Sequence, residues 1–226
     1  LTTGDNNVAV GFEALKTEDA NGNSVAIGYR ALKTQNAGAE AYNVAIGVDA
    51  GTAITTGTAN TFVGGLAGDA TDDGTNNTAM GYLALSANCG NDNVAIGKSS
   101  LQVATGGGNV AVGKDAGLSL TSGELNTFIG ASAGDGTDDG NDNVAIGHQA
   151  LSANAGDDNV AIGKDALLVN VANQNIAIGS HALDADVNGG TSVAIGHNAL
   201  TAQAPATATD MLNVAVGNSA GAAVTT

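Results

Sequence analysis

The chain has no tryptophan, one cysteine, three tyrosines and three phenylalanines among 226 residues, whereas 34 residues are glycine. Cores of single domains of this length usually rely on bulky Leu, Phe, Trp and Met. Here the hydrophobic fraction is 43%, and it consists mostly of Ala, Val, Ile and Leu. We therefore expect packing by repetition in place of an ordinary globular core. A single cysteine, Cys89, excludes an intrachain disulfide and does not report on the redox compartment.

Basic residues are also scarce, at 6 against 22 acidic residues, which gives a formal net charge of −16. Such a chain is repelled by nucleic-acid phosphates and by anionic lipid surfaces. No apolar run approaches the roughly 20 residues of a membrane-spanning helix, and no signal peptide is recognisable. We expect neither nucleic-acid binding nor membrane insertion. The first residue is Leu1, so we also expect this segment to belong to a longer chain.

A five-residue signature recurs thirteen times along residues 1–226. It begins with Asn, or with Ser at Ser24 and Ser192, continues with β-branched and small apolar residues, and ends with Gly. Spacings are 16 or 17 residues, except for 19 before Gly47 and 21 before Gly217. The terminal glycines are Gly11, Gly28, Gly47, Gly64, Gly81, Gly97, Gly113, Gly130, Gly147, Gly163, Gly179, Gly196 and Gly217. This pattern predicts one repeat array without internal domain boundaries.

A longer period of four repeats is superimposed on the short one. A shift of 66 residues aligns Thr71–Gly74 with Thr137–Gly140, and Asn60–Gly64 with Asn126–Gly130. The same shift places Cys89 opposite Ala155, so we interpret the cysteine as the occupant of a small-residue position. The four repeats form a super-repeat that duplicated as a block.

Each repeat is typical of one turn of a parallel β-solenoid, which makes the predicted fold class all-β. The Val-Ala-Ile core favours a strand, and the Gly, Asn, Asp and Thr clusters between cores favour turns. A helix is disfavoured because no 3.6-residue apolar period is sustained and the recurring glycine costs about 1 kcal/mol in a helix interior. The sequence predicts about thirteen stacked turns of 16–17 residues.

Both faces of the short strand are unsuited to water. In the signature that ends at Gly47, Val44 and Ile46 point one way, whereas Asn43, Ala45 and Gly47 point the other. One set must fill a thin interior, and the other must form an apolar stripe, which monomers rarely expose. We expect identical chains to bury this stripe in a closed assembly.

The repeats 77–85 and 93–97 resemble the head repeats of trimeric autotransporter adhesins. They resemble more closely the Asn-Thr-Ala-Val/Ile-Gly repeats of phage tail fibres and bacterial surface proteins that carry a C-terminal intramolecular chaperone domain. This resemblance implies a left-handed parallel β-roll, a homotrimeric rod, and a place outside the cell, on a virion or a bacterial surface. The 16–17-residue turn is longer than that of the autotransporter heads, so the outer loops cannot be transferred.

Two groups of residues are candidate binding sites. The turn carboxylates Asp135, Asp138, Asp139 and Asp142 could bind Ca²⁺, which takes six to eight oxygen ligands; solvated turns of an acidic protein are the interpretation we favour. The positions directly after the signature glycines should form one ridge, on which Tyr29, Tyr82, Lys98, Lys114 and Lys164 could contact a host-surface glycan or protein receptor. The alternative for this ridge is a solvated edge, which we prefer. We expect no catalytic residue and no cofactor.

The sequence is most typical of a structural and adhesive shaft or head module of a phage tail fibre or a bacterial surface adhesin. A polysaccharide-acting β-solenoid enzyme is one alternative, but its two carboxylates would have to come from variable, duplicated turns. An ice-binding or structural filament protein is another, although the Thr pairs recur too irregularly for a flat array.

Overall fold

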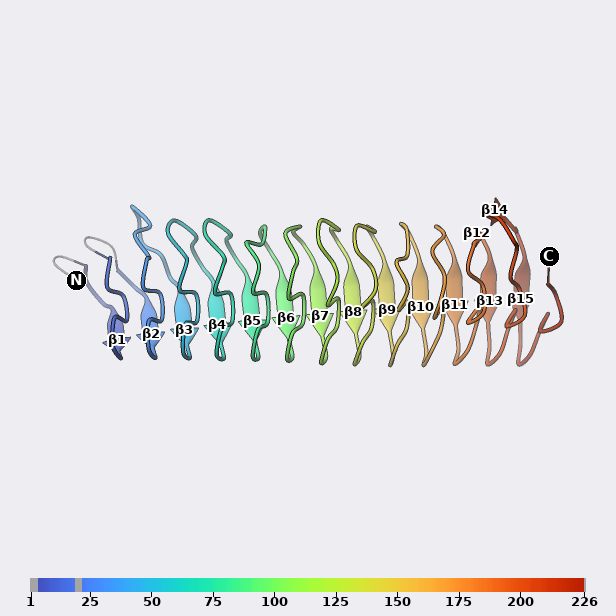
Figure 1. Cartoon of the computed structure of the whole chain (residues 1–226), viewed down its shortest axis with the longest axis horizontal. Helices are drawn as coiled ribbons and strands as arrows, with labels where there is room; N and C mark the ends of the chain where they lie inside the picture. Colours follow the sequence, from blue (N-terminus) through green and yellow to red (C-terminus); the bar gives the residue numbers. More distant parts are fainter. Residues whose placement is uncertain (1–3, 19–21, 226) are drawn as a thin grey trace. The chain divides into compact units, whose positions relative to one another are not determined.

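The computed structural model describes residues 4–18 and 22–225, and none of these residues is helical. Thirteen of the described strands have three residues each and coincide with the thirteen predicted cores. The chain forms two compact units, Leu1–Asn109 (unit 1) and Val110–Thr226 (unit 2), each a stack of coils with one such strand per coil (Figure 1). The predicted parallel β-solenoid is confirmed.

Unit 1 contains one sheet in which neighbours along the chain are neighbours in space. Its strands pair in parallel and in register, so that Ala26 lies opposite Ala9 and Ala45 lies opposite Ala26. The strands are β1 (Val8–Val10), β2 (Val25–Ile27), β3 (Val44–Ile46), β4 (Thr61–Val63), β5 (Thr78–Met80) and β6 (Val94–Ile96).

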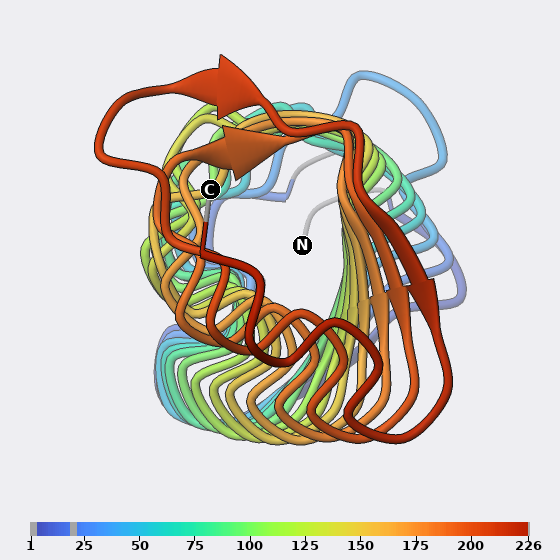
Figure 2. The same ribbon diagram turned by 90° about the vertical axis from the view of Figure 1, so that its right-hand side faces the viewer.

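Unit 2 repeats this arrangement and adds one short two-stranded sheet. Its main sheet contains β7 (Val110–Val112), β8 (Thr127–Ile129), β9 (Val144–Ile146), β10 (Val160–Ile162), β11 (Ile176–Ile178), β13 (Val193–Ile195) and β15 (Val214–Val216). The small sheet pairs β12 (Gly189–Gly190) with β14 (Thr209–Asp210). Seen from its carboxyl-terminal end, the chain of unit 2 runs clockwise while it advances toward the viewer, so its coil is left-handed (Figure 2).

The structure decides which face of each strand is interior. Ala145 is fully buried, whereas Ile146 beside it is 36% exposed, and Val144 is half-buried. The same pattern recurs in the coils of β2 to β11 and of β13, with the central Ala or Phe and the preceding Asn or Ser inside, whereas β1 is exposed at all three residues. Leucines four residues after the signature glycine, such as Leu85 and Leu151, complete the interior. Small residues are needed inside because a coil of 16 or 17 residues encloses little space.

The signature glycine is required by the close approach of consecutive coils. Gly47 has a φ of +146°, and a Cβ atom added to it would lie 2.3 Å from the carbonyl oxygen of Gly64 in the next coil. No side chain fits there without moving the backbone, and the φ value itself disfavours any L-residue. The glycine therefore sets the coil spacing at the end of every strand.

A row of asparagines joins the coils from the inside; we call it the asparagine ladder. The Oδ1 atom of each ladder residue accepts a hydrogen bond from the backbone N–H of the equivalent residue in the next coil, at 2.8–3.0 Å. Its Nδ2 donates to a carbonyl 13 or 14 residues later, at 2.8–3.0 Å. The members are Asn43, Asn60, Asn77, Asn93, Asn126, Asn143, Asn159 and Asn175. Each amide thus satisfies polar backbone groups that would otherwise be buried unpaired.

Two phenylalanines replace the central alanine and are accommodated inside the coil. Phe62 and Phe128 are fully buried. A Cβ atom on Gly68 would lie 2.5 Å from the Phe62 ring, and one on Gly134 would lie 2.6 Å from the Phe128 ring. Both glycines occupy the position that holds Leu in most other coils, so relative to those coils each pair exchanges Ala plus Leu for Phe plus Gly; Gly51 and Gly117 occupy it in coils that keep the central Ala. The volume is compensated within one interior.

Candidate functional site

The outward residues of the strands form a row of aliphatic side chains on each unit; we call it the aliphatic stripe. In unit 1 the row includes Val8, Val10, Ile27, Ile46, Met80 and Ile96, which are between 36% and 57% exposed. In unit 2 it includes Ile129, Ile146, Ile176, Ile178, Ile195, Val214 and Val216. In-register pairing places these residues directly beside one another. Each stripe is a continuous apolar surface on a single chain.

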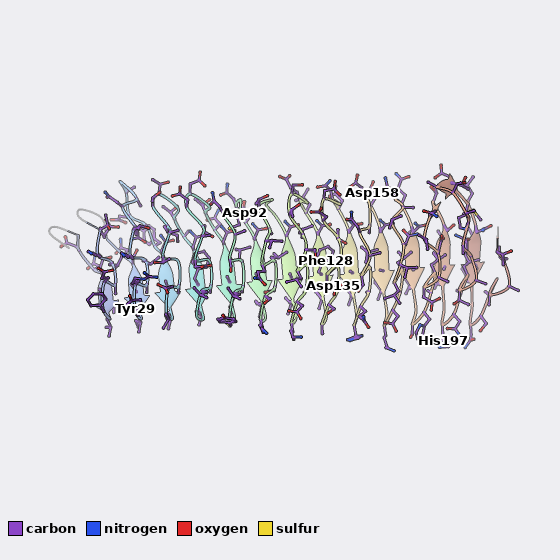
Figure 3. All side chains as sticks on the ribbon, in the orientation of Figure 1. Tyr29, Asp92, Phe128, Asp135, Asp158 and His197 are labelled. Carbon is purple, nitrogen blue, oxygen red and sulfur yellow. The ribbon has the colours of Figure 1, made fainter. Side chains whose placement is uncertain are left out.

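The positions after the signature glycines lie beside the stripe and form a second row, the exit ladder. Within unit 1 it carries Phe12, Tyr29, Val48, Gly65, Tyr82 and Lys98, all exposed except Gly65. The rings of Phe12 and Tyr29 stack at 5.7 Å with an angle of 12°, and the Arg30 guanidinium lies 5.0 Å from the Tyr29 ring. Figure 3 places Tyr29 at the end of its strand and Asp92 at the far corner of its own coil.

The receptor-binding candidates occupy this ridge but do not converge. Tyr29 contacts Phe12 and Arg30, whereas Tyr82 lies three coils further on. Lys98 follows Tyr82 in the next coil. In unit 2, Lys114 forms an ion pair with Asp115 at 2.8 Å, which raises the pKa of the lysine, and Lys164 forms one with Asp165 at 3.0 Å. These lysines therefore carry compensated charge, and their role as a receptor site stays a prediction.

The calcium candidates all lie in unit 2, on turns outside the strands. The Oδ1 atom of Asp135 is buried without a hydrogen-bond partner, and the carboxylate of Asp138 accepts a hydrogen bond from Thr121. Asp139 and Asp142 are exposed. Within residues 4–18 and 22–225, no three His, Cys, Asp or Glu side chains form a metal-binding group. The calcium site also stays a prediction.

One histidine of unit 2 belongs to a charged corner that the sequence pattern did not indicate. His181 Nδ1 lies 3.0 Å from Asp184 Oδ2, and its Nε2 lies 3.7 Å from Asp165 Oδ2. Thr201 donates a hydrogen bond of 2.5 Å to Asp184. The His197 ring meets the His181 ring edge-on at 6.4 Å. Asp184 is thus hydrogen-bonded both to His181 and to Thr201 of the next coil, so the corner joins neighbouring coils through polar contacts.

Two buried carboxyl groups lie inside the coils, where sequence analysis placed none. Glu18 accepts a hydrogen bond of 2.8 Å from Gln35, and Asp186 accepts one of 2.5 Å from Gln203. Burial raises the pKa of Asp186, against the effect of its hydrogen bonds. A signal was present, because each glutamine follows one of the two serines of the signature by 11 residues.

The second long spacing, before Gly217, produces a projecting arm. Residues 204–211 leave the path of the neighbouring coils of unit 2 and return through β14 (Figure 2). Beneath the arm lies an open groove of about 470 Å³. Its lining is formed by Val171, Ala172, Asn173, Gln174, Asn188, Gly190, Ala208, Thr209 and Asp210. The sequence marked this place only by its 21-residue spacing.

Comparison of the chain with protein-family models, curated proteins and solved structures finds no match. The part of the chain that the structure describes contains no helix long and apolar enough to cross a membrane. The function must therefore be argued from the surfaces themselves.

Proposed function

We propose that this chain is a structural and adhesive shaft module that assembles as a homotrimer on the outside of a virion or a bacterial cell and contributes to attachment. It acts by holding and presenting surfaces, with no catalytic centre of its own. The observation that supports this proposal is the aliphatic stripe, which repeats in register along the strands of both units.

The stripe requires a partner that repeats at the same interval. Soluble monomers seldom expose contiguous apolar patches above a few hundred Å², and here the last outward residue of most strands, such as Ile46 or Ile146, is more than one-third exposed. A second copy of the same chain, aligned in parallel, offers an apolar row with matching spacing. Closed symmetric rings bury such rows completely, and the resemblance of the repeats to trimeric adhesins favours three copies.

The duplication of the turn carboxylates favours a passive module over a polysaccharide-acting enzyme. Turn aspartates such as Asp72 and Asp138 occupy equivalent positions in the super-repeat and accept the same hydrogen bond from a threonine of the preceding coil. A structural role shared by both copies accounts for them. Glycoside hydrolysis needs two carboxyl groups facing one bond, which duplicated turn residues do not provide.

The oligomeric state tests this proposal directly. The chain has a mass of 21.7 kDa, so the trimer should scatter light as a particle of about 65 kDa, three chains. Size-exclusion chromatography with multi-angle light scattering should show this mass across a range of concentrations. A stable monomer would refute the proposal.

A pair of variants tests whether the stripe is the interface. Ile146→Asp places a carboxylate in the centre of the stripe of unit 2, where burying an unpaired charge costs several kcal/mol, and we expect it to yield monomers. His148→Asp changes an exposed residue of the exit ladder two positions away and should leave the trimer intact. Circular dichroism of both variants checks that the coil itself remains folded. Equal assembly of the two variants would contradict the assignment of the interface.

A further inference from the structure

The groove under the arm of unit 2 interrupts the repeated surface, because the arm belongs to the 21-residue spacing before Gly217. One wall comes from residues 171–174 in the coil of β10, and the floor comes from Asn188 and Gly190. The other wall comes from Ala208, Thr209 and Asp210 on the arm. Three successive coils therefore contribute to one concave site, and its opening faces solvent.

The walls are fixed by hydrogen bonds before any ligand binds. The arm is joined to the floor by Thr209 N–H to the Asn188 carbonyl at 3.2 Å and Met211 N–H to the Gly190 carbonyl at 3.0 Å. Asn188 Nδ2 donates to the Pro205 carbonyl at 3.2 Å. Because these bonds fix the arm to the residues of the floor, little ordering of the arm is needed on binding.

A strained residue, Thr191, lies outside the lining of the groove but is hydrogen-bonded to two of its residues. Thr191 has a φ of 59°, which is an outlier for a β-branched residue. Its hydroxyl donates a hydrogen bond of 3.0 Å to Asp210 Oδ1, and its N–H donates to the Asn173 carbonyl at 3.2 Å. Thr191 therefore fixes the direction of the Asp210 carboxylate at the edge of the groove. A carboxylate accepts up to about four hydrogen bonds, so this bond leaves capacity for a ligand.

The chemistry of the lining defines the ligand class. Gln174 and Asn188 provide amide donors and acceptors, Asp210 provides acceptors, and Val171, Ala172 and Ala208 provide apolar contact. No Lys, Arg or His lies among these lining residues, and the chain carries a net charge of −16. Vicinal hydroxyls next to C–H faces match this combination of groups, whereas sulfated, phosphorylated or sialylated ligands would meet only negative charge.

We propose that this groove binds a neutral oligosaccharide, with Asp210 and Gln174 accepting and donating hydrogen bonds to sugar hydroxyls and Ala208 packing against a ring face. The proposal deepens the proposed function, because it rests on the adhesive role and names the ligand and its site.

A blocking variant provides the main test. Ala208→Trp should fill the groove without removing a polar group, whereas Ala206→Trp places the same ring on an exposed residue of the arm that does not line the groove. Both assembled proteins are applied to an array of neutral oligosaccharides of two to six sugars, with sialylated and sulfated chains as charged comparators. We expect binding to neutral chains by the native protein and by Ala206→Trp, and its loss in Ala208→Trp.

A second pair removes one polar contact without adding bulk. Gln174 and Gln149 both have a left-handed backbone in unit 2, at φ values of 61° and 54°, so replacement by alanine has a similar backbone effect in each. Gln174→Ala should weaken oligosaccharide binding by about 3- to 10-fold, the effect of one neutral hydrogen bond. Gln149→Ala should leave the affinity unchanged. Titration calorimetry with the best oligosaccharide from the array measures both.

The results separate this proposal from the proposed function. Absence of neutral oligosaccharide binding by the native protein, a preference for charged chains, or equal binding by Ala208→Trp would each overturn the groove proposal. The light-scattering trimer and the effect of Ile146→Asp would still support the shaft in each of those cases. Conversely, a monomer that binds neutral oligosaccharides through Ala208 would support the groove and refute the shaft.

Discussion

At the scale of single residues, the ladder asparagines explain why the signature begins with this amino acid. Each one receives the N–H of the next coil on Oδ1 and donates through Nδ2 to a turn carbonyl. Serine, threonine or leucine could fill the volume, but none can serve both groups at once. Asparagine is required at this position because its amide bonds both a backbone N–H and a backbone carbonyl in the buried interior of the coil.

This argument predicts a large effect from one ladder residue. Asn60→Ala leaves the buried N–H of Asn77 and the carbonyl of Gly74 without their partner, which should lower the free energy of unfolding by about 2–4 kcal/mol. Asn36→Ala changes an exposed asparagine of the same unit and should lower it by less than about 0.5 kcal/mol. Urea denaturation followed by circular dichroism compares the two. Similar midpoints would show that the ladder bonds contribute no net stability.

At the scale of the element, the two coils whose signature begins with serine differ from the other coils also in length. Ser24 and Ser192 precede the two longest spacings, of 19 and 21 residues. In each coil a buried glutamine donates to the serine hydroxyl, at 3.1 and 3.2 Å, and accepts from the next signature asparagine, at 2.9 and 2.7 Å. In each of these coils the glutamine therefore connects the signature serine with the signature asparagine of the next coil.

The serine and glutamine should therefore act as one unit. Ser192→Ala and Gln203→Ala, combined in a double-mutant cycle, should show a coupling energy of about 1 kcal/mol, as expected of side chains in contact. Ser180→Ala with Gln203→Ala provides the control cycle, because Ser180 directly follows Gly179 and so belongs to the exit ladder of another coil. Additive effects in the first cycle would disprove the coupling.

The sequence predicted the strands well, because a glycine that no other residue can replace marks the end of each one. It predicted two faces for the strand but not which face is interior. That choice depends on whether Asn43 finds its partners inside the coil, at Asn60 and Gly57, and these contacts follow from the path of the whole turn. The groove could not be predicted, because it depends on where the inserted arm docks, which periodicity does not encode.

At the scale of the whole molecule, acidic charge dominates and predicts an unusual dependence of stability on pH. Burial raises the pKa values of Asp69 and Asp186, so both carboxyl groups bind a proton at higher pH in the folded state than in the unfolded state. Unfolding is then less favourable when the pH falls through that interval. Reduction of the net charge of −16 acts in the same direction.

We therefore expect the melting temperature to rise at first as the pH is lowered from 7.5 toward the range in which these two carboxyl groups bind protons. The trend should reverse at lower pH, because Glu13, whose pKa is lowered to about 2 by Lys16 and Lys33, stabilises the fold above its unfolded pKa and loses this effect as the pH falls toward 2. Differential scanning calorimetry at low ionic strength measures the curve. Asp69→Asn should reduce this initial rise, whereas Asp139→Asn at an exposed turn should not. A melting temperature that falls continuously as the pH is lowered from 7.5 would contradict this account.

The asparagine ladder also bears on how such a chain can change its length over evolutionary time. The Oδ1 atom of every ladder residue bonds the equivalent residue of the adjacent coil, so this connection is the same between any two neighbouring coils, whatever the number of coils in the stack. Unequal recombination between repeated stretches of the gene, when it inserts or removes complete coils, leaves each remaining amide with an equivalent partner. The 66-residue duplication is one such event, and populations of this gene should therefore vary in steps of one coil.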